Sequence, residues 1–353
     1  GTCAGPQCIP TIRDAIGNVT AVKNLKWLEA CDDMKCESAN FSGAIDLGQW
    51  ADTIVLAMGI SGEIEGEGHD RMDIRLPGLQ YDLVKAIIQT NPGKPIVLLL
   101  FNGGMVSIED LKDENIAVVE CWYPGATGGT SVAEMLFGDT NRFGKLPFTH
   151  YNYNYTLLSN FSDMNMTASL TNPGRSYKYL EDENLALWPF GFGLSYTQFE
   201  LSSSDTTLQS RGDETHMLPR SIPLPLPLHS SGSSGSSGSR GSSRGSSAAT
   251  WFTTSITVKN IGDREGDEVV FLFHNGSSAV KSFEPSDPLA KKILIAYDRV
   301  TLCAGCSKDV VFNITLDKLS TVDRYGTRHV LSGEHALVFS RGHGKTFIQA
   351  INV

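Results

Sequence analysis

Residues 51–71 read ADTIVLAMGISGEIEGEGHDR, a short apolar run followed by a cluster of acids. Residues 53–58 have the length and the continuous apolar character of a parallel strand that is covered on both faces. Four acids then fall within eight residues: Glu63, Glu65, Glu67 and Asp70. Open α/β sheets place their ligand chemistry in loops at the carboxyl ends of strands, and crowded carboxylates repel one another. The stretch therefore predicts a layered α/β domain with half of an active site in this loop.

The residues after the acidic loop continue the alternation of apolar strands and helices. Residues 94–101 and 116–122 are two further apolar runs of strand length. Residues 79–90 and 130–137 predict helices, the first because its apolar residues recur at helical spacing. A succession of strand, helix and strand is typical of a parallel sheet with helices on its faces.

The last hundred residues predict a domain of another class. Short strand-like runs with alternating apolar residues are separated by turn residues, over 255–259, 268–273, 292–300, 307–315 and 335–339. Several short strands with regular turns are typical of a β-sandwich. We therefore expect an α/β sandwich domain with trailing loops over residues 1–200 and a β-sandwich over residues 251–353.

Residues 201–250 between these domains have a different composition. Residues 222–228 alternate proline with isoleucine or leucine, and residues 230–247 consist almost wholly of serine, glycine and arginine. The first pattern predicts extended, polyproline-like chain, and the second a flexible surface insertion. The excess of arginine leaves a basic interaction arm as an alternative.

The formal net charge of −10 excludes some classes of partner. Nonspecific binding to nucleic acid or to an anionic membrane needs a positive field, so we expect neither partner. No apolar stretch approaches the roughly 18 residues that a membrane-spanning helix requires. An uncharged or cationic substrate suits this chain better.

Glycosylation sequons predict secretion, or the lumen of a secretory or lysosomal compartment. Seven occur, with acceptors at Asn18, Asn40, Asn154, Asn160, Asn165, Asn275 and Asn313. The cysteines agree with this prediction because six of the seven fall into close pairs, Cys3 with Cys8, Cys31 with Cys36 and Cys303 with Cys306, which leaves Cys121 over. We expect three local disulfides. A redox or zinc motif is the alternative for Cys303 and Cys306, but no second half and no histidine pair accompany them, so we expect no metal and no cofactor.

Three stretches together resemble the carboxy-terminal half of family 3 glycoside hydrolases, particularly the β-xylosidase branch. The first is IEGEGHDR over residues 64–71, followed by Leu76, Pro77 and Gln80. The second, residues 122–147, contains PG, GG, LFGD and GKLP, and the third is WPFGFGLSYTQF over residues 188–199. The order and spacing of the three stretches carry the resemblance. Residues 258–263, 266–270 and 331–334 are also similar to the fibronectin type III-like module that ends many such enzymes.

The resemblance implies a retaining mechanism on β-linked oligosaccharides of the xylan type. Two carboxylates about 5–5.5 Å apart share the work in that mechanism, one as nucleophile and one as acid and then base. The family's nucleophile is an aspartate on an amino-terminal (β/α)8 barrel, and its acid/base lies in the loop matched here. Glu67 fits the acid/base position best because the family has Glu-Gly-aromatic-Asp-Arg there. Glu65 is the second choice and Glu63 the third.

The neighbours of these acids have supporting roles in this interpretation. We expect Arg71 to hold Asp70 ionised and to brace the loop, and His69 to replace an aromatic residue that faces the sugar or packs beside it. Without the flanking motifs, a solvated acidic loop or a calcium-binding turn is the alternative.

A barrel takes about 250 residues, and the roughly 50 before the first strand here cannot supply one. We therefore expect the barrel on another chain or a cleaved segment, and no activity without it. Two alternatives stay open: a β-glucosidase of the same family, and a noncatalytic secreted module with a structural or adhesive role.

Overall fold

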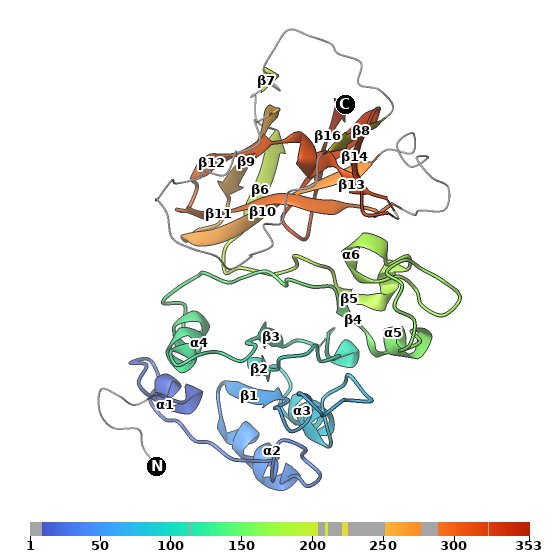
Figure 1. Ribbon diagram of the computed structural model, residues 1–353. Coiled ribbons are helices and arrows are strands. Elements are labelled where there is room, and N and C mark those ends of the chain that lie inside the picture. Colours follow the sequence, from blue (N-terminus) through green and yellow to red (C-terminus); the bar gives the residue numbers. More distant parts are fainter. Residues whose placement is uncertain are drawn as a thin grey trace, which may run out of the picture. The chain divides into compact units, whose positions relative to one another are not determined.

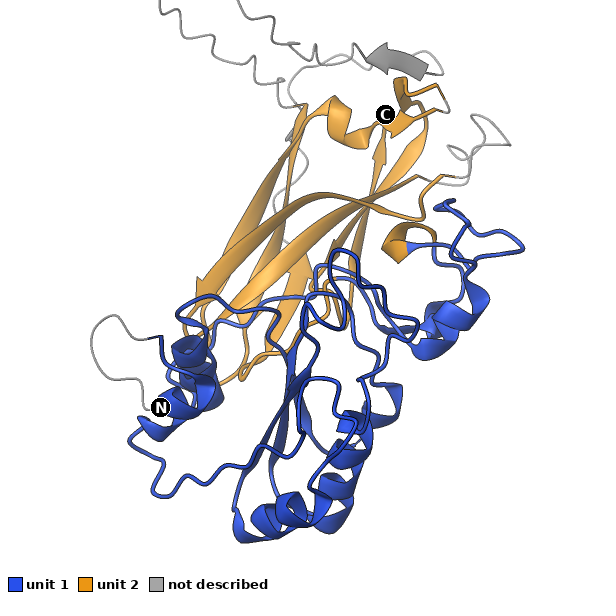
Figure 2. Cartoon of the chain, turned by 60° about the horizontal axis from the view of Figure 1, so that its bottom comes forward, with its two compact units in different colours: residues 1–175, 180–190 blue, residues 176–179, 191–353 orange. Residues whose placement is uncertain are grey.

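The computed structural model describes residues 9–112, 114–203, 209–210, 221–224, 251–276, 289–323 and 325–353. The chain forms two compact units (Figure 2). Unit 1 comprises Gly1–Arg175 and Leu180–Phe190, and unit 2 comprises Ser176–Tyr179 and Gly191–Val353. Across the described residues, no helix has both the length and the apolar character that crossing a bilayer requires.

A three-stranded parallel sheet organises unit 1 (Figure 1). Its strands, in spatial order, are β1 (Ile54–Gly59), β2 (Ile96–Phe101) and β3 (Ala117–Glu120). The central strand is buried most deeply, with Leu98 and Leu99 fully inaccessible to solvent. This burial explains the apolar run of β2. The expectation of cover on both faces is wrong for the other two strands, since Val55 and Ala57 of β1 and Ala117 of β3 are exposed. The three strands confirm the predicted α/β class.

Two helices pack on this sheet through apolar faces, α2 (Phe41–Trp50) and α3 (Gln80–Thr90). Two others, α1 (Ile12–Gly17) and α4 (Gly128–Leu136), pack on each other. Ile87 of α3 forms one apolar cluster with Ile54 of β1 and Ile96 of β2, and residues of α2 border the same cluster. Figure 1 shows α2 and α3 together beside β1. The predicted helices are thus confirmed, and α4 begins two residues earlier than expected.

Residues from about 141 to 197 were expected to form long ordered loops, and they also contain short elements. They are β4 (His150–Tyr151), α5 (Tyr153–Leu158), η2 (Glu183–Leu185) and β5 (Ala186–Trp188), whereas η1 (Glu109–Leu111) lies earlier, after β2. β4 and β5 pair as an antiparallel ribbon. The two residues of β4 and the three of β5 are too few for a periodic pattern, so the sequence did not predict them.

Unit 2 is a β-sandwich with one core. One sheet orders β12 (Ser307–Ile314), β9 (Phe252–Asn260) and β6 (Phe199–Ser203), with β7 (Gln209–Ser210) also paired to β9. The other orders β11 (Ile293–Leu302), β10 (Gly266–Gly276), β15 (Glu334–Ser340) and β16 (Phe347–Asn352). A small third sheet orders β13 (Thr321–Val322), β14 (Arg328–Leu331) and β8 (Ser221–Leu224), and β14 contacts η4 (Leu316–Leu319). Unit 2 also contains the short helix α6 (Ser176–Tyr179). All five predicted strands are present.

The sandwich draws strands from beyond the segment predicted for it. β6 pairs with β9 through Leu201 and Val258, and both side chains are buried in the sandwich core. β8 pairs with β14, so residues 222–224 of the predicted polyproline-like run are extended but form part of a strand. Most of the rest of the insert lies outside the described residues. The units divide after Phe190, whereas we expected the first domain to end near residue 200.

Candidate active site

The acidic loop begins directly after β1, and contacts with β2 fix the backbone position at which it begins. Gly59 ends the strand with φ +155°, and its Cα lies so close to the Phe101 carbonyl on β2 that no Cβ fits there. The Ile60 amide then donates to the same Phe101 carbonyl oxygen at 2.9 Å. Only glycine meets both requirements, so the loop starts in a backbone position set by the sheet.

Gln80 ties this starting point to two other segments. The Gly59 amide donates to Gln80 Oε1 at 2.9 Å, and Gln80 Nε2 donates to the Gly59 carbonyl at 3.0 Å and to the Met34 carbonyl at 2.9 Å. The side chain is only 3% exposed, so these bonds replace its contacts with water. In the sequence Gln80 was noted only as part of the family resemblance, and no local pattern indicates its role.

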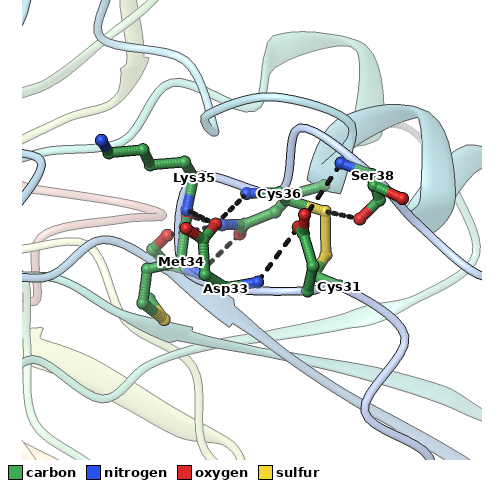
Figure 3. Close-up of a disulfide and its surroundings, with 9 residues drawn as sticks. Cys31, Asp33, Met34, Lys35, Cys36 and Ser38 are labelled. Atoms are coloured by element: carbon green, nitrogen blue, oxygen red, sulfur yellow. Dashed lines mark hydrogen bonds between the residues drawn. A yellow bond between two sulfur atoms is a disulfide. The ribbon is translucent and has the colours of Figure 1, made fainter.

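The Cys31–Cys36 disulfide closes the loop that carries Met34 (Figure 3). The Asp33 carboxylate accepts from the Lys35 and Cys36 amides inside this loop, at 2.8 and 3.0 Å. The Cys36 carbonyl in turn accepts from the Leu79 amide at 2.9 Å, just before α3. The predicted bridge is confirmed, and it supports the end of α3 on which Gln80 lies.

Glu67 lies at the tip of a tight turn. The Gly66 amide donates to the His69 carbonyl and the His69 amide to the Gly66 carbonyl, both at 3.0 Å. Gly68 completes the turn with φ +80°, the conformation that a type II turn requires at its third position. Glu67 is exposed, and among the described residues its carboxylate has no hydrogen bond or ion pair. The carboxylate is therefore free to contact a molecule outside this chain.

Glu65 lies deeper and is already paired. Its carboxylate forms an ion pair with the Arg71 guanidinium, and Arg71 Nη2 donates to the Met105 carbonyl at 2.9 Å. The Arg71 side chain is 10% exposed and that of Glu65 36%. Arg71 thus braces the loop through Glu65, and our expectation that it pairs with Asp70 is wrong. The turn at residues 66–69 leaves Asp70 exposed, as it does His69.

An open cavity of about 670 Å³ lies behind the acidic loop, within unit 1. The disulfide loop contributes Lys35 to it, the acidic loop Glu63 and Arg71, and α3 Tyr81. Glu67 is not one of its lining residues. Glu63, the third choice for the acid/base, therefore lines this cavity, whereas Glu67, the first choice, does not.

One acid at the carboxyl end of the sheet was not predicted as a site residue from the sequence. Glu120 is the last residue of β3, and its Oε1 atom is buried. Burial raises the pKa of the Glu120 carboxyl to about 7, although the Asn102 side chain and the Trp122 amide act in the opposite direction. The signal for Glu120 in the sequence is an acid at the carboxyl end of an apolar strand.

The predicted glycosylation acceptors are mostly accessible. Asn18, Asn40, Asn154, Asn160, Asn165 and Asn313 are exposed, and Asn275 at the end of β10 is half-buried. Asn40 also caps α2, since its side chain accepts from the Gly43 amide at 2.9 Å. Exposure is compatible with glycan attachment at six of the seven sequons.

The remaining cysteine predictions have mixed outcomes. Cys303 and Cys306 form the predicted disulfide. Cys121 has a free thiol, whereas Cys3 and Cys8 lie outside the described residues. In the described ranges, no group of three or more histidine, cysteine, aspartate or glutamate side chains is arranged to hold a metal ion.

Comparison with known families and proteins extends these observations. Residues 4–196 match the family model described as the glycosyl hydrolase family 3 C-terminal domain. The chain is 30% identical to Beta-D-xylosidase 1 of Arabidopsis thaliana over 96% of its own length and 42% of that protein. It is 33% identical to Beta-D-xylosidase 3 of the same plant, over 86% of this chain and 38% of that one. The chain thus spans about two fifths of these relatives.

Solved structures show the same similarity. A GH3 exo-beta-xylosidase in complex with a xylobiose aziridine probe superposes with a TM-score of 0.73 and 27% identity, covering 91% of this chain and 38% of that chain. A beta-glucosidase from Kluyveromyces marxianus in complex with glucose superposes with a TM-score of 0.65 and 26% identity, covering 89% and 33%. The α/β unit and the β-sandwich unit of this chain therefore both have counterparts in these solved structures.

Proposed function

This chain belongs to glycosyl hydrolase family 3, and we propose that it is the carboxy-terminal part of an exo-acting, retaining β-xylosidase. Its substrates are β-linked xylo-oligosaccharides. The observation that carries the proposal is the free Glu67 carboxylate at the tip of the turn after β1. The similarity to plant β-xylosidases over nearly the whole chain supports the choice of substrate.

Glu67 supplies the acid and then the base in this proposal. An aspartate of the barrel attacks the anomeric carbon while the Glu67 carboxyl protonates the departing glycosidic oxygen, so that the C–O bond breaks and a glycosyl-enzyme forms. The Glu67 carboxylate then takes a proton from water as that water attacks the anomeric carbon and releases the barrel aspartate. The turn exposes Glu67 at the surface of this chain. A residue that acts on a substrate held by another domain must be exposed in this way.

Glu65 suits the acid/base role less well. Its carboxylate accepts from the Arg71 guanidinium, and an arginine partner favours the charged form of a carboxyl group over the proton-carrying form. Its contact with Gly104 also keeps it against the segment that follows β2. We assign Glu65 a bracing role and keep it as the second choice for the acid/base.

The barrel that carries the nucleophile is the proposed partner. The chain covers only 38–42% of its plant relatives, which leaves room in those proteins for a domain of that size. The barrel lies in the same polypeptide as these residues, on another chain or on a cleaved segment. The pair forms the complete site, and neither half turns over substrate alone.

The test combines this chain with a family 3 barrel segment from the same source and measures hydrolysis of xylobiose. We expect turnover from the combination only, and a loss of about 10²–10⁴-fold in kcat for Glu67→Gln, the usual contribution of general acid/base catalysis. Glu65→Gln is the matched variant and should retain most of kcat.

Two results would contradict the proposal. A large loss in Glu65→Gln with little change in Glu67→Gln would transfer the acid/base role to Glu65. A stable complex with a complete barrel that hydrolyses no glycoside would favour the noncatalytic structural or adhesive module.

A β-glucosidase is the second candidate, because solved beta-glucosidases superpose on this chain with TM-scores near that of the xylosidase. The barrel contributes most of the contacts that distinguish xylose from glucose in this proposal, so the present chain does not decide between them. Comparing kcat/KM for aryl β-xyloside and aryl β-glucoside on the complete enzyme separates the two.

We also propose that the protein is a secreted glycoprotein. Six exposed sequon asparagines and two disulfides support this. Native material should lose mass on enzymatic removal of N-glycans, with the acceptor asparagines converted to aspartate. No mass change would contradict the proposal.

A further inference from the structure

Residues 157–170 of unit 1, which we call the apolar loop, comprise the end of α5 and the loop after it (Figure 1). Six of its large apolar side chains are exposed, at Leu157, Leu158, Phe161, Met164, Met166 and Leu170. Phe161 is 93% exposed and Met164 85%. A phenylalanine alone presents on the order of 150–250 Å², and the largest apolar patch on a typical monomer covers roughly 300–600 Å². Six such side chains in one loop therefore indicate an interaction surface.

Polar groups fold the apolar loop around Asp163. The Asp163 carboxylate accepts from the Ser169 and Thr171 hydroxyl groups, at 2.8 and 2.6 Å. It also accepts from Asn172 Nδ2 and from the Asn165 amide, both at 2.9 Å. These hydrogen bonds, that from Thr171 first, hold the pKa of Asp163 well below its usual range, so the carboxylate stays charged. Because polar groups occupy the centre of the loop, its apolar side chains have no apolar interior into which they could withdraw.

The base of the apolar loop is closed as well. The Asn160 amide donates to the Thr171 carbonyl at 2.7 Å, and the Tyr155 hydroxyl donates to the Gly174 carbonyl at 3.3 Å. Tyr155 is itself buried in an apolar cluster with Leu180. Hydrogen bonds at its centre and at its base therefore fix the conformation in which the loop presents its apolar side chains.

The sequence around the apolar loop is almost free of charge. From residue 146 to residue 174 the only aspartate, glutamate, lysine or arginine is Asp163, although these four types make up 19% of the chain. The charge of Asp163 is already used within the loop. Permanent interfaces are more apolar than other surfaces, and their cores are poor in charged residues. The composition therefore indicates a surface that another folded domain covers.

The segment that carries the apolar loop is connected to the acidic loop. Just before α5, the Tyr151 amide donates to Met105 Sδ at 3.0 Å, and the Met105 carbonyl accepts from Arg71 Nη2 at 2.9 Å. The Arg75 guanidinium carbon lies 4.3 Å from the centroid of the Tyr153 ring, at the start of α5. A domain that docks on the apolar loop is thereby held in a fixed relation to the acidic loop, which an active site made from two domains requires.

We propose that the apolar loop is a docking surface for the family 3 barrel that carries the nucleophile, with Phe161 as its aromatic anchor. This inference rests on the proposed function, which makes the barrel the partner. The connection to the acidic loop favours the barrel over a second copy of this chain, because a second copy brings no nucleophile to the site. The surface of the barrel that meets the apolar loop is apolar and carries no charged side chain at its centre.

Hydroxyl-radical footprinting read by mass spectrometry tests the docking surface. The 353-residue chain alone is compared with the complete protein that includes the barrel. We expect labelling of Phe161 and Met164 to fall about tenfold in the complete protein, because the core of such an interface excludes water. Tyr297 on β11 is 68% exposed and serves as the control, with equal labelling in both samples. Equal labelling of Phe161 and Met164 in the two samples would overturn the inference, and so would an equal fall at Tyr297.

A charge placed on the docking surface should weaken the complex. In Phe161→Asp the chain alone should unfold at the same urea concentration as wild type, because the side chain is exposed. Its dissociation constant for a separately prepared barrel segment should rise about 30-fold, the effect of losing an interface anchor. Phe161→Leu should retain most of the affinity, and Tyr297→Asp, the matched control, all of it. An unchanged dissociation constant in Phe161→Asp would contradict the inference.

Other occupants of the apolar loop give different results. A dimer of the 353-residue chain that Phe161→Asp dissociates, and that the barrel segment does not displace, would assign the surface to a second copy. A glycan on Asn160 or Asn165 in active native protein would place sugar on the surface instead, because both acceptors lie within the loop. Docking of the barrel predicts a monomeric chain and no glycan at these two asparagines.

The footprinting and affinity measurements do not depend on turnover. Protection of Phe161 in a complete protein that hydrolyses no glycoside would refute the proposed function and leave the docking surface intact. An active complete protein in which Phe161 is labelled as in the chain alone would refute only the docking surface.

Discussion

Gly68 determines where the proposed acid/base residue points. Its φ of +80° closes the turn that holds Glu67 at the tip, and nothing lies within 4 Å of the place where a Cβ would be. Gly68→Ala therefore meets no steric neighbour and strains only the backbone. We expect a loss of about 1–2 kcal/mol in the free energy of unfolding, measured with urea.

Gly62 provides the matched control for Gly68. It lies in the same loop with equally open space around a Cβ, and its φ is outside the left-handed region. Gly62→Ala should change the free energy of unfolding little. Equal losses in the two variants would show that the conformation of Gly68 is not the cause.

Single residues also show where local sequence was an incomplete guide. The Glu-Gly-His-Asp-Arg pattern indicated Glu67 and Arg71, and both lie in the loop that follows β1. Adjacency in the sequence suggested Asp70 as the partner of Arg71, but the turn brings Glu65 to it instead. Pairing between side chains depends on how the loop folds back, which a linear pattern does not specify.

At the level of elements, a buried histidine pair joins β10 to β15. His274 Nε2 lies 2.7 Å from His335 Nδ1, and His335 Nε2 lies 2.7 Å from the Leu331 carbonyl oxygen. Because a carbonyl only accepts, His335 Nε2 carries a hydrogen, and when His335 is neutral its Nδ1 accepts from His274 Nε2. Burial lowers the pKa of both rings, which favours their neutral forms in the folded sandwich.

This pair predicts a loss of stability in acid. Burial lowers the pKa of His274 to about 4, and burial also lowers the pKa of His335. The unfolded chain, with a histidine pKa near 6.5, binds more protons between these values. The contribution is fully present above about pH 6.5 and is lost as the pH falls toward 4, by about 3 kcal/mol for His274.

Hydrogen exchange of β10 and β15 between pH 7 and pH 4.5 measures this effect. Protection in wild type should fall more steeply with acid than in His274→Gln, and His69→Gln, at an exposed position, should follow wild type. Equal slopes in wild type and His274→Gln would mean that the pair does not carry the acid sensitivity.

Considered as a whole, the molecule has a chain that enters unit 2 at α6 and returns to unit 1 before forming the sandwich (Figure 2). Within unit 2, the Lys291 amide donates to the Lys178 carbonyl at 2.8 Å and the Leu294 amide to the Tyr177 hydroxyl at 3.3 Å. The Tyr177 ring also meets Phe273 edge-on at 5.7 Å between centroids. α6 is therefore a structural part of the sandwich.

Fragments test this assignment. A fragment of residues 176–353 should be more stable to urea than one of residues 180–353, by about 2–3 kcal/mol for two hydrogen bonds and an aromatic contact. The two fragments share residues 180–190, so only α6 differs. Equal stability would show that α6 does not contribute to the fold of unit 2.

The sequence by itself determined the class of both domains, the position of the acidic loop and the Cys31–Cys36 bridge. These features follow from local causes: continuous apolar runs form covered parallel strands, alternating runs form half-covered ones, and cysteines close in the chain are easily joined. The membership in glycosyl hydrolase family 3 also rests on motifs within the chain.

Only the tertiary structure decided which partners meet. Gln80 contacts Gly59 and Met34, 21 and 46 residues away, and Arg71 contacts Met105, 34 residues away. Strand β8 pairs with β14 across about a hundred residues, and Glu120 acquires its properties from burial beside Asn102. The free energies of these contacts depend on burial and on distances between remote segments, and neither quantity is encoded in local periodicity.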